Sequence, residues 1–517
     1  MPSRPVAPAS PAIRPRRVTP HPLAGLADHL GVPAPVGAER VVVTGITHAS
    51  AQVHPGDVYA GLLGQRTHGA RFVPDAASRG ALALLTDAEG ATLAAPTGLP
   101  ALVVADPREV LGDAAAWVYD FPARRLRSYG VTGTNGKTTV TSLLHAVLST
   151  VVGPAGLVGT IETRIGERVV PSVRTTPEAS DLQALLAVMV QDGVHGVALE
   201  VSSHALALGR VGGLVLDVAG FTQLTQDHLD FHGTMEAYFE AKASLFTPAH
   251  SRRGVVVVDD HWGRRLAVRA SVPMTTVAVR PDEPDHALVR AADWRVERIS
   301  PAGAGHLATV TGPAGRRYQV PATIPGLVNV SNAVLTLAMA VAGGLDGDAV
   351  VAALADAPPV AGRMEVVSAD PLVVVDYAHT PDAVTAALQT LRAGGREPLV
   401  VVLGAGGDRD AGKRGPMGRA AADGADLVVV TDDNPRSEDP AAIRAAVRAG
   451  AQAVDPARVV EVGDRAEAIA LALREGRTGT VLVAGKGHEQ GQEVAGVVHP
   501  FDDRAVVRAL LRDGGAR

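Results

Sequence analysis

The stretch Tyr129-Gly-Val-Thr-Gly-Thr-Asn-Gly-Lys-Thr-Thr139 decides the fold of this chain. A short apolar run ends there in a glycine-rich loop, which a lysine, two threonines and the helix-like run 140–148 follow. This order is typical of a strand, a phosphate-binding loop and a helix N-terminus, whose free N–H groups and dipole favour an anion. The sequence therefore predicts a protein that uses a nucleoside triphosphate.

Each residue type of the loop has a use in binding phosphate. Gly133 and Gly136 let the backbone approach a phosphate, Lys137 supplies a positive charge, and Thr138 supplies a hydroxyl for a phosphate-bound Mg2+. The standard spacing G-x-x-x-x-G-K-[ST] is not met, because Val131 stands where the first glycine belongs. We therefore predict a shorter variant of the loop. The alternative is a glycine-rich turn with an exposed lysine.

Length and composition restrict the class of protein. The 517 residues are enough for roughly three domains of the usual size. Aromatic residues are only 3%, so the cores must consist of Ala, Val and Leu. The net charge of −6 does not suggest a nucleic-acid binder, which is usually basic. The absence of cysteine excludes disulfides and thiolate metal sites, and fits the cytoplasmic location that we expect.

The chain begins with a segment rich in proline and arginine. Residues 1–22 lack the apolar core of a secretory signal, and we expect them to form a disordered leader. A basic arm that binds nucleic acid is the alternative. No apolar run reaches the roughly 18 residues that a membrane-spanning helix needs. We expect no insertion into a membrane.

The rest of the chain divides into three blocks, with predicted domain limits of 23–126, 127–361 and 362–517. In the third block, the apolar runs 372–376, 399–403, 427–431 and 481–484 alternate with helix-like stretches. Such alternation is typical of βαβ units, which form a parallel sheet with helices on both faces. The predicted fold class is α/β. Ligands of such sheets bind beyond the carboxyl ends of the strands, where polar clusters follow several of these runs.

Three features of the second block are candidates for metal binding or proton transfer. Glu200 follows a buried strand and is well placed for Mg2+, although a helix-capping acid is the alternative. The stretch Asp227-His-Leu-Asp-Phe-His232 could bind metal or move protons. Lys242 lies inside an apolar helix, and by itself it is best explained as a lysine that extends to solvent.

In the third block, the loop Asp433-Asn-Pro-Arg436 contains groups that bind ligands of opposite charge. Arg436 offers a planar fork for a carboxylate, while Asp433 and Asn434 can accept an ammonium group. An amino acid with two charged ends would require both. The alternative is a turn that caps the next helix.

Seven motifs together resemble those of the Mur ligases of peptidoglycan synthesis. They occur in this order: Gly133-Thr-Asn-Gly-Lys-Thr-Thr139, Glu200-Val-Ser-Ser-His204, Asp227-His-Leu-Asp-Phe-His-Gly233, Glu240-Ala-Lys242, Asn329-Val-Ser-Asn332, Asp376-Tyr-Ala-His-Thr-Pro381 and Asp433-Asn-Pro-Arg436. Each motif alone is only moderately specific, whereas the series is very specific. The similarity covers nearly the whole chain after the proline-rich segment.

The resemblance implies a small α/β domain that binds a uridine nucleotide, a central P-loop-type ATPase domain with a mainly parallel sheet, and a C-terminal Rossmann-like domain for an amino acid. It implies that ATP phosphorylates the D-glutamyl γ-carboxylate of UDP-N-acetylmuramoyl-L-Ala-D-Glu. The amine of meso-2,6-diaminopimelate then attacks the acyl phosphate and displaces phosphate. It also implies a monomer that binds small molecules and no nucleic acid.

The resemblance also implies roles for individual residues. The catalytic residues would be Lys137, His228 and Lys242. ATP would be bound by Gly133, Thr134, Asn135, Gly136, Lys137, Thr138, Thr139, Asn329, Asn332, Arg363 and Asp376. Mg2+ would be held by Thr138, Glu200, His228 and Lys242, which would be carbamylated to N6-carboxylysine. This role replaces the interpretation of Lys242 as a solvent-exposed lysine.

For the other two substrates the resemblance implies two further sets. The UDP-muramoyl peptide would contact Ser50, Thr175, Thr176, Ser202 and Arg210. Diaminopimelate would be bound by Arg409, Asp433, Asn434, Pro435, Arg436, Gly485 and Glu489. An arginine at position 436 separates this type from relatives that add L-lysine, which has no distal carboxylate.

The chain departs from the family pattern at two places. The family usually has Asp-Ser-Arg near the uridine site, where this chain has Ala49-Ser50-Ala51, and Leu208 replaces a glutamine. The alternatives are a Mur ligase that adds L-lysine or another residue, a folylpolyglutamate synthase, and a nucleotide-binding scaffold that forms no amide.

Overall fold

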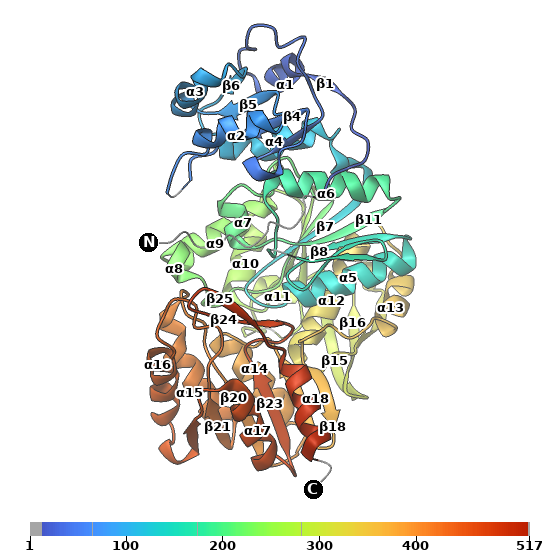
Figure 1. Cartoon of the computed structure of the whole chain (residues 1–517). Helices are drawn as coiled ribbons and strands as arrows, with labels where there is room; N and C mark the ends of the chain where they lie inside the picture. The colour runs from blue at the N-terminus through green and yellow to red at the C-terminus, as the bar shows by residue number, and fades with distance from the viewer. Residues whose placement is uncertain (1–12, 65, 173, 281, 515–517) are drawn as a thin grey trace.

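The computed structural model describes residues 13–64, 66–172, 174–280 and 282–514. Three α/β domains follow one another along the chain, from the first at the top of Figure 1 to the third at the bottom. Their main sheets lie between residues 45 and 103, 127 and 322, and 365 and 484. The fold class is as predicted, whereas the residue limits of the domains stay a prediction.

The first domain has a parallel sheet in the order β3-β4-β5-β6. Its strands are β3 (Gly45–Thr47), β4 (Asp57–Ala60), β5 (Ala83–Thr86) and β6 (Ala101–Val103). Helices α1 (Leu23–Leu30) and α4 (Pro107–Val118) pack on one face, and α2 (Val73–Ser78) and α3 (Ala88–Ala94) pack on the other. A 3-10 turn, Ser50–Gln52, connects β3 to β4.

The prediction of a disordered leader over residues 1–22 is wrong for residues 13–22. Strand β1 (His21–Pro22) pairs with β2 (Val42–Val43), and Arg14 bonds to Asp57 of β4. Buried charge partners and backbone pairing fix this segment, and proline content does not report them. Residues 1–12 lie outside the described residues.

The central domain contains an eleven-stranded sheet in the order β10-β9-β8-β11-β7-β12-β13-β14-β15-β16-β17. Its strands are β7 (Arg127–Thr132), β8 (Ala155–Val158), β9 (Thr163–Ile165), β10 (Arg168–Val170), β11 (Gly196–Glu200), β12 (Val218–Phe221), β13 (Gly254–Val257), β14 (Met274–Ala278), β15 (Trp294–Ala302), β16 (Gly305–Thr311) and β17 (Arg317–Ala322). Strands β8 to β15 in this order run parallel, and antiparallel strands extend both edges.

Helices cover both faces of the central sheet. Helices α5 (Lys137–Val151), α12 (Leu327–Ala342) and α13 (Gly347–Ala355) pack in one apolar layer. Helices α6 (Ala179–Gln191), α9 (Met235–Ala243) and α10 (His261–Arg269) pack in the other. No described helix has the length and apolar character that crossing a membrane requires.

The C-terminal domain has a six-stranded sheet in the order β18-β19-β23-β20-β21-β22, parallel except for β18. Its strands are β18 (Glu365–Ala369), β19 (Leu372–Asp376), β20 (Leu399–Leu403), β21 (Leu427–Val430), β22 (Val459–Glu461) and β23 (Thr480–Ala484). Helices α14 (Pro381–Arg392), α15 (Arg414–Gly424) and α16 (Pro440–Gln452) share one core, and α17 (Arg465–Glu475) and α18 (Asp503–Gly514) share the other. A hairpin of β24 (Gly491–Val494) and β25 (Val497–Pro500) precedes α18.

A fully buried ion pair joins α17 to α18. The guanidinium of Arg465 bonds both carboxylate oxygens of Asp503 at 2.8 Å, and neither side chain is exposed. The same guanidinium donates to the carbonyl of Ala484 at 2.9 Å and to that of Asp432 at 3.4 Å. It therefore fixes the ends of two strands, directly before Gly485 and Asp433.

We predict that Arg465→Met destabilises the C-terminal domain by about 3–5 kcal/mol, because it leaves Asp503 buried without a partner. The double variant Arg465→Met/Asp503→Leu should be destabilised less, since neither charge then remains. Urea unfolding monitored by circular dichroism measures both changes. Arg316→Met, which breaks the exposed pair with Asp348, is the control and should cost no more than about 1 kcal/mol. Equal stability of Arg465→Met and the control would contradict the prediction.

Candidate active site

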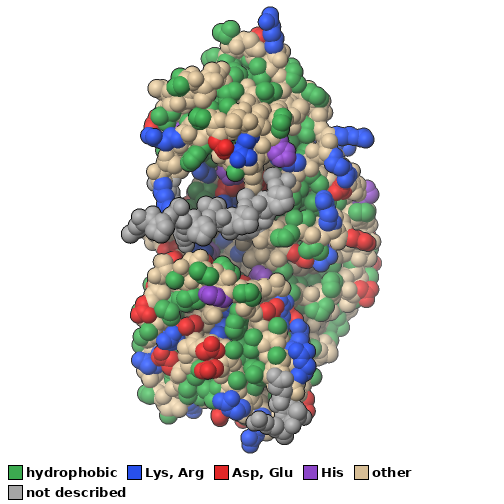
Figure 2. Space-filling view, viewed as in Figure 1, with side chains coloured by type: hydrophobic (Ala, Val, Ile, Leu, Met, Phe, Trp, Pro, Cys, Tyr) green, Lys and Arg blue, Asp and Glu red, His purple; other side chains and the backbone are tan. Residues whose placement is uncertain are grey.

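One cavity of about 1010 Å³ lies between the central and C-terminal domains, and it collects most of the predicted site residues. Figure 2 shows the molecular surface hollowed between the first domain and the part below it. The predicted residues in the cavity lining are Thr134, Asn135, Gly136, Lys137, Thr138, Thr139, Thr175, Thr176, Glu200, Ser202, Arg210, His228, Asn329, Asn332, Arg363, Asp376, Arg409, Asp433, Asn434, Arg436, Gly485 and Glu489. Those outside the lining are Ser50, Gly133, Lys242 and Pro435.

The phosphate loop connects β7 to α5, as predicted, and glycine is required at two of its positions. Gly133 has φ +144° and Gly136 has φ +88°, in the region that favours glycine. A Cβ at Gly133 would lie 1.9 Å from Oγ1 of Thr222, and one at Gly136 would lie 2.6 Å from Oδ1 of Asn332. The loop therefore brings its backbone to the N-terminus of the fifteen-residue helix α5 without side chains in between.

Lys137 begins α5 and folds back over the loop. Its Nζ donates to the carbonyls of Gly133 at 2.9 Å and Thr134 at 2.8 Å. Burial lowers the pKa of Lys137, and the carboxylates of Glu200 and Asp227 oppose that change. The ammonium therefore lies in the loop that would surround a phosphate, with only neutral carbonyls as its bonded partners.

Thr138 connects the two domains that form the cavity. Its Oγ1 donates to Oε2 of Glu200 at 3.0 Å, and Nη2 of Arg363 in the C-terminal domain donates to the same hydroxyl at 2.9 Å. The backbone N–H of Thr160 donates to the other oxygen of Glu200 at 2.8 Å. The hydroxyl and the carboxylate are hard oxygen donors of the kind that Mg2+ prefers.

The stretch 227–232 does not form a metal site of its own. Asp227 is engaged by two groups of the C-terminal domain, since its carboxylate lies 3.1 Å from Nζ of Lys413 and 3.6 Å from Nε2 of His379. No group of three His, Asp or Glu side chains among the described residues could hold a metal ion. Mg2+ would therefore need oxygen donors from a bound phosphate in addition to Glu200 and Thr138.

His228 lies beside this contact in a neutral state. It has φ +55°, its Nε2 lies 3.5 Å from Oδ2 of Asp227, and its ring meets that of His204 edge-on with centroids 4.8 Å apart. Burial lowers the pKa of His228 to about 3, although Asp227 opposes the change. At neutral pH the ring is therefore uncharged, as a metal ligand or a base must be.

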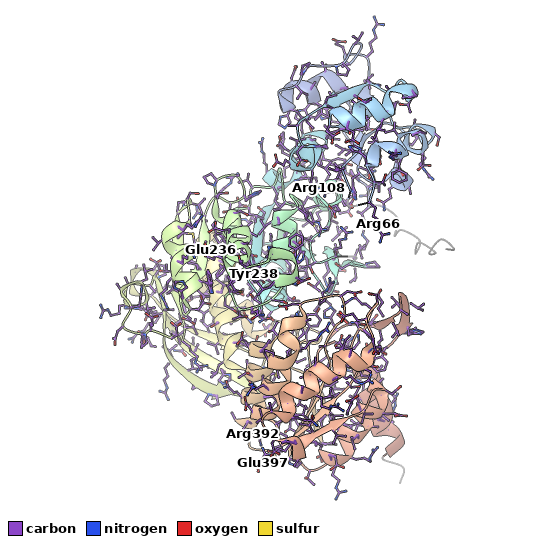
Figure 3. All side chains as sticks on the ribbon, turned by 90° about the vertical axis from the view of Figure 1, so that its left-hand side faces the viewer. Arg66, Arg108, Glu236, Tyr238, Arg392 and Glu397 are labelled. Carbon is purple, nitrogen blue, oxygen red and sulfur yellow. The ribbon has the colours of Figure 1, made fainter. Side chains whose placement is uncertain are left out.

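Lys242 is buried, so its interpretation as a lysine that extends to solvent is wrong. Only 1% of the residue is exposed on α9, and its Nζ donates to the carbonyl of Gly133 at 2.8 Å. The ammonium also lies 4.6 Å from the ring centroid of Tyr238, which Figure 3 labels in the interior of the domain. Burial, together with the charge of Lys137, lowers the pKa of Lys242 well below its usual value. The amine of Lys242 therefore loses its proton more easily than that of an exposed lysine.

Two asparagines of α12 face the loop. Nδ2 of Asn332 donates to Oδ1 of Asn329 at 2.9 Å, and Nδ2 of Asn329 donates to the carbonyl of Pro325 at 2.7 Å. Asp376, from the C-terminal domain, also lies in the cavity lining. Burial raises the pKa of Asp376, although the charge of Arg363 opposes the change. The guanidinium of Arg363 lies 4.6 Å from the ring centroid of Tyr377.

A row of hydroxyls lies beside Glu200, towards the first domain. Oγ1 of Thr160 and Oγ1 of Thr175 are 2.9 Å apart, and Oγ1 of Thr176 donates to the carbonyl of Glu200 at 2.8 Å. The backbone N–H of Ser202 donates to the hydroxyl of Thr176 at 3.2 Å. This row leads from the phosphate loop towards Arg210, which pairs with Glu178 at 3.0 Å.

The loop Asp433-Asn-Pro-Arg436 lies at the far end of the cavity, beyond β21. Arg436 has φ +54° and donates through Nη1 to the carbonyl of Gly407 at 2.6 Å, and its Nε is 3.7 Å from Glu493 of the hairpin. The backbone N–H of Arg436 donates to the carbonyl of Glu493, so β24 supports the loop. Within the same wall, Nδ2 of Asn434 donates to Oε2 of Glu489 at 2.7 Å.

Several polar residues of the cavity lining were not predicted to have a role. Lys413 and His379 meet Asp227 across the domain boundary, and Thr160 and Thr222 fix Glu200 and the phosphate loop. His379 stands in one of the quoted motifs, but Lys413 lies at the start of a helix without a motif. Only its buried position identifies it.

Comparisons with known proteins agree on one family. Residues 42–119, 131–340 and 362–487 match the models described as "Mur ligase family, catalytic domain", "Mur ligase middle domain" and "Mur ligase, glutamate ligase domain". The chain is 51% identical over 505 residues to the UDP-N-acetylmuramoyl-L-alanyl-D-glutamate–2,6-diaminopimelate ligase of Streptomyces coelicolor, which covers 96% of this chain and 98% of that protein. It is 46% identical over 518 residues to the UDP-N-acetylmuramyl-tripeptide synthetase of Leifsonia xyli, covering 98% of this chain and 99% of that one.

The fold also resembles that of solved structures. A structure of a UDP-N-acetylmuramoyl-L-alanyl-D-glutamate–2,6-diaminopimelate ligase matches with a TM-score of 0.66 and 32% identity, over 95% of this chain and 99% of that one. The folylpolyglutamate synthase of Mycobacterium tuberculosis, complexed with ADP, matches in fold with a TM-score of 0.59 and 24% identity, over 74% of this chain and 92% of that one.

We predict that Lys137→Met weakens the binding of ATP about 10- to 100-fold. Methionine has a side chain of similar length, but it removes the charged hydrogen-bond donor from the phosphate loop. Isothermal titration calorimetry of the purified protein with ATP measures the change in Kd. Arg127→Met, at the exposed start of β7, is the control and should bind ATP as the wild type does. An unchanged Kd for Lys137→Met would contradict the assignment of the loop.

Proposed function

The chain belongs to the Mur ligase family, and from this we propose that it joins meso-2,6-diaminopimelate to the D-glutamyl γ-carboxylate of UDP-N-acetylmuramoyl-L-Ala-D-Glu. It is an ATP-dependent ligase of peptidoglycan synthesis. The observation that carries the choice of amino acid is the presence of Arg436 and of the phosphate loop in the lining of one cavity.

The first chemical problem is that an amine cannot displace oxide from a carboxylate. The carboxylate oxygen must first become part of a phosphate, so two anions must meet. Lys137 and Arg363 supply positive charge at the loop from opposite domains, and the backbone N–H groups at the start of α5 orient the phosphates. In this proposal the hydroxyls of Thr175 and Thr176, which lie beside Glu200, would contact the muramoyl peptide.

The second step is attack of an amine on the acyl phosphate. Asp433, Asn434 and Glu489 at the end of the cavity can orient a cationic amino acid, and Arg436 can take its distal carboxylate. The attacking amine must lose its proton. The uncharged His228 lies in the same lining, but its lowered pKa makes it a weak base, so it suits the binding of Mg2+ better than the role of proton acceptor.

Mg2+ would be held by Thr138, Glu200, His228 and carbamylated Lys242. It would neutralise the charge of the phosphates, which is its general use in phosphoryl transfer. Within the part of the chain that the structure describes, no carboxylate bonds to the buried amine of Lys242, and the lowered pKa of that amine favours the addition of CO2. The modification would turn a cation in the middle of the site into an anion.

Two further proposals concern the state of the protein. We propose that it acts in the cytoplasm as a monomer, in support of cell-wall synthesis, cell shape and division. Its substrates are small molecules, and the net charge of −6 argues against a nucleic-acid partner.

A ligase that adds L-lysine is the alternative that most needs a test, because the name of the Leifsonia xyli relative leaves the added residue open. L-Lysine would bring no distal carboxylate to the guanidinium of Arg436, whose nearest carboxylate would then be that of Glu493 at 3.7 Å. A guanidinium that lacks the carboxylate of its substrate in this way gives strong discrimination. A folylpolyglutamate synthase shares the fold, but it adds glutamate, which has no distal ammonium group for Asp433 and Asn434 to accept.

We predict that phosphate release from ATP in the presence of the UDP-muramoyl dipeptide is faster with diaminopimelate than with L-lysine by about 100-fold or more in kcat/KM. Arg436→Met should raise the KM for diaminopimelate about 10- to 100-fold and leave turnover of L-lysine unchanged. A coupled phosphate assay measures both. Arg419→Met, exposed on α15, is the control with unchanged kinetics. Equal kcat/KM for the two amino acids in the wild type would remove the proposed specificity.

We predict that Lys242 is carbamylated near neutral pH. Its lowered pKa leaves the amine neutral at a pH where an ordinary lysine is charged, and the modification should be lost as the pH falls through that pKa. Incubation with 13C-bicarbonate should give a carbamate signal in NMR spectra of the wild type, and none from this site in Lys242→Ala. Short carboxylic acids should restore part of the activity of Lys242→Ala. Identical spectra of the two proteins would show that Lys242 is unmodified.

A further inference from the structure

Lysine is rare in this chain, and every lysine lies at the cavity or directly behind its lining. Only four of the 48 Lys and Arg residues are lysines: Lys137, Lys242, Lys413 and Lys486. The first two bond the phosphate loop, and Lys413 bonds Asp227 between the central and C-terminal domains. Lys486 lies behind the pocket that we propose for the amino acid. The chain therefore uses arginine at its other cationic positions, and keeps the compact ammonium group of lysine for the interior of the site.

Lys486 is fully buried behind the wall of the amino-acid pocket. It follows β23 and comes directly after Gly485, which lines the cavity. None of its surface is exposed, and it does not belong to the cavity lining. Its Nζ donates to Oε2 of Glu489 at 3.0 Å and to Oδ1 of Asn434 at 3.2 Å, and both of these residues do line the cavity. The ammonium group therefore supports the lining from the protein side.

The hydrogen bonds of this cluster fix the amide of Asn434. Oδ1 of Asn434 also accepts from the backbone N–H of Glu493 on β24 at 3.0 Å, and Nδ2 donates to Oε2 of Glu489 at 2.7 Å. An ammonium group and a backbone N–H can only donate, while a carboxylate can only accept. These partners therefore allow one orientation of the amide, with its oxygen towards Lys486 and its nitrogen towards Glu489.

The same bonds decide which oxygen of Glu489 is left for a ligand. Oε2 accepts from both Lys486 and Asn434, whereas Oε1 has no hydrogen bond from the residues that the structure describes. The side chain of Glu489 is 29% exposed, and the residue lines the cavity. A carboxylate that is held at one oxygen in this way can offer the other to an ammonium group of a ligand.

We propose that Lys486 is a positioning residue for the distal ammonium group of the amino-acid substrate: from behind the lining it holds Oε2 of Glu489, so that Oε1 is left for the ligand. The inference rests on the proposed function, since it assumes that diaminopimelate binds beside Glu489. Lys486 acts only through Glu489 and Asn434. Arg436 takes the distal carboxylate of the same substrate, so the two charged groups at the distal end have separate supports.

The loss of Lys486 should change the pocket without unfolding the domain. In Lys486→Met a side chain of similar length removes the buried charge. Its partner Glu489 is partly exposed, so water can solvate the carboxylate that remains, and no buried charge is left unpaired. With the amide of Asn434 as its one remaining donor, the carboxylate of Glu489 can turn away from the position in which it meets a ligand.

The test compares two amino acids that differ only in the distal ammonium group. 2-Aminopimelate has both carboxylates of diaminopimelate and the amine that attacks, but it has no second amine. We expect Lys486→Met to raise the KM for diaminopimelate roughly tenfold or more, because the displacement of a positioning group has effects of this size. The KM values for 2-aminopimelate, ATP and the UDP-muramoyl dipeptide should not change, and kcat should stay near that of the wild type.

Arg504→Met is the matched control. The side chain of Arg504 is 12% exposed, and its Nη2 donates to the carbonyl of His488 at 3.4 Å, directly before Glu489. Its ion pairs in the described part of the chain are with Asp502 and Glu365, which lie outside the cavity lining. The variant should have wild-type KM values for both amino acids. Lys486→Gln keeps a hydrogen-bond donor without the charge and should lie between Lys486→Met and the wild type. If Lys486→Met does not fold, Lys486→Gln takes its place.

A double-mutant cycle tests whether Lys486 acts through Glu489. Glu489→Gln alone should raise the KM for diaminopimelate and leave that for 2-aminopimelate unchanged. In Glu489→Gln/Lys486→Met the second substitution should then add little, because the two residues act as one unit. A further tenfold rise from the second substitution would overturn the proposed route of action.

The outcomes separate the failure of this inference from the failure of the proposed function. A wild-type protein that forms no product from diaminopimelate, ATP and the UDP-muramoyl dipeptide would overturn the proposed function, and the inference with it. An active wild type with the same kcat/KM for diaminopimelate and 2-aminopimelate would overturn the inference alone. An unchanged KM for diaminopimelate in Lys486→Met would also overturn it. So would an equal rise for both amino acids, because it would indicate a general loss of structure in the pocket.

Discussion

The hydrogen bond from Arg363 to Thr138 joins the two halves of the site, and the rest of the arrangement depends on it. Thr138 stands at the N-terminus of α5 and also donates to Glu200, while Arg363 comes from the start of the C-terminal domain. A single hydroxyl thus meets a carboxylate from the neighbouring strand and a guanidinium from the next domain. The carboxyl ends of two parallel sheets are brought to one cavity, which is where open α/β sheets bind ligands. A reaction between three substrates needs such a convergence, since no single sheet edge could hold all of them.

The electrostatics of the phosphate loop follow from the neutral partners of its two lysines, whose printed hydrogen bonds go to backbone carbonyls. Lys137 and Lys242 both donate to the carbonyl of Gly133, so two amines compete for one neutral acceptor. Burial and mutual repulsion lower the pKa of Lys242 in particular. Two anionic substrates relieve this imbalance when they bind, and carbamylation would relieve it further by reversing the charge of one amine. The positive groups of the phosphate loop are therefore in place before an anionic substrate binds, which is what electrostatic preorganisation means.

Much of this could be predicted from the sequence, because local signals coincide with the elements. The apolar runs 372–376 and 399–403 are strands with these same limits, and the loop at Gly133 and Gly136 lies between a strand and a helix as expected. Two things were not predicted. The antiparallel extension of the central sheet consists of two consecutive hairpins, in which β16 pairs with β15 and β17 pairs with β16. The order of residues 13–22 depends on buried partners such as Asp57, whereas the proline content of the segment suggests disorder.

Buried ion pairs occur at the seams of the molecule, and each consists of residues far apart in sequence. Arg14 pairs with Asp57 in the first domain, Lys413 with Asp227 between the second and third, and Arg465 with Asp503 inside the third. A buried pair is a poor source of stability, because the cost of removing two charges from water offsets most of their attraction. The positions of the two side chains are nevertheless closely restricted, because a buried charge that moves away from its partner destabilises the protein strongly. Three such pairs lie beside the turn Ser50–Gln52, beside His228 and beside the ends of the strands that precede Asp433 and Gly485. Each of these places lies beside a residue that we predict to bind a substrate or a metal ion, so we interpret the pairs as fixing the positions of these loops.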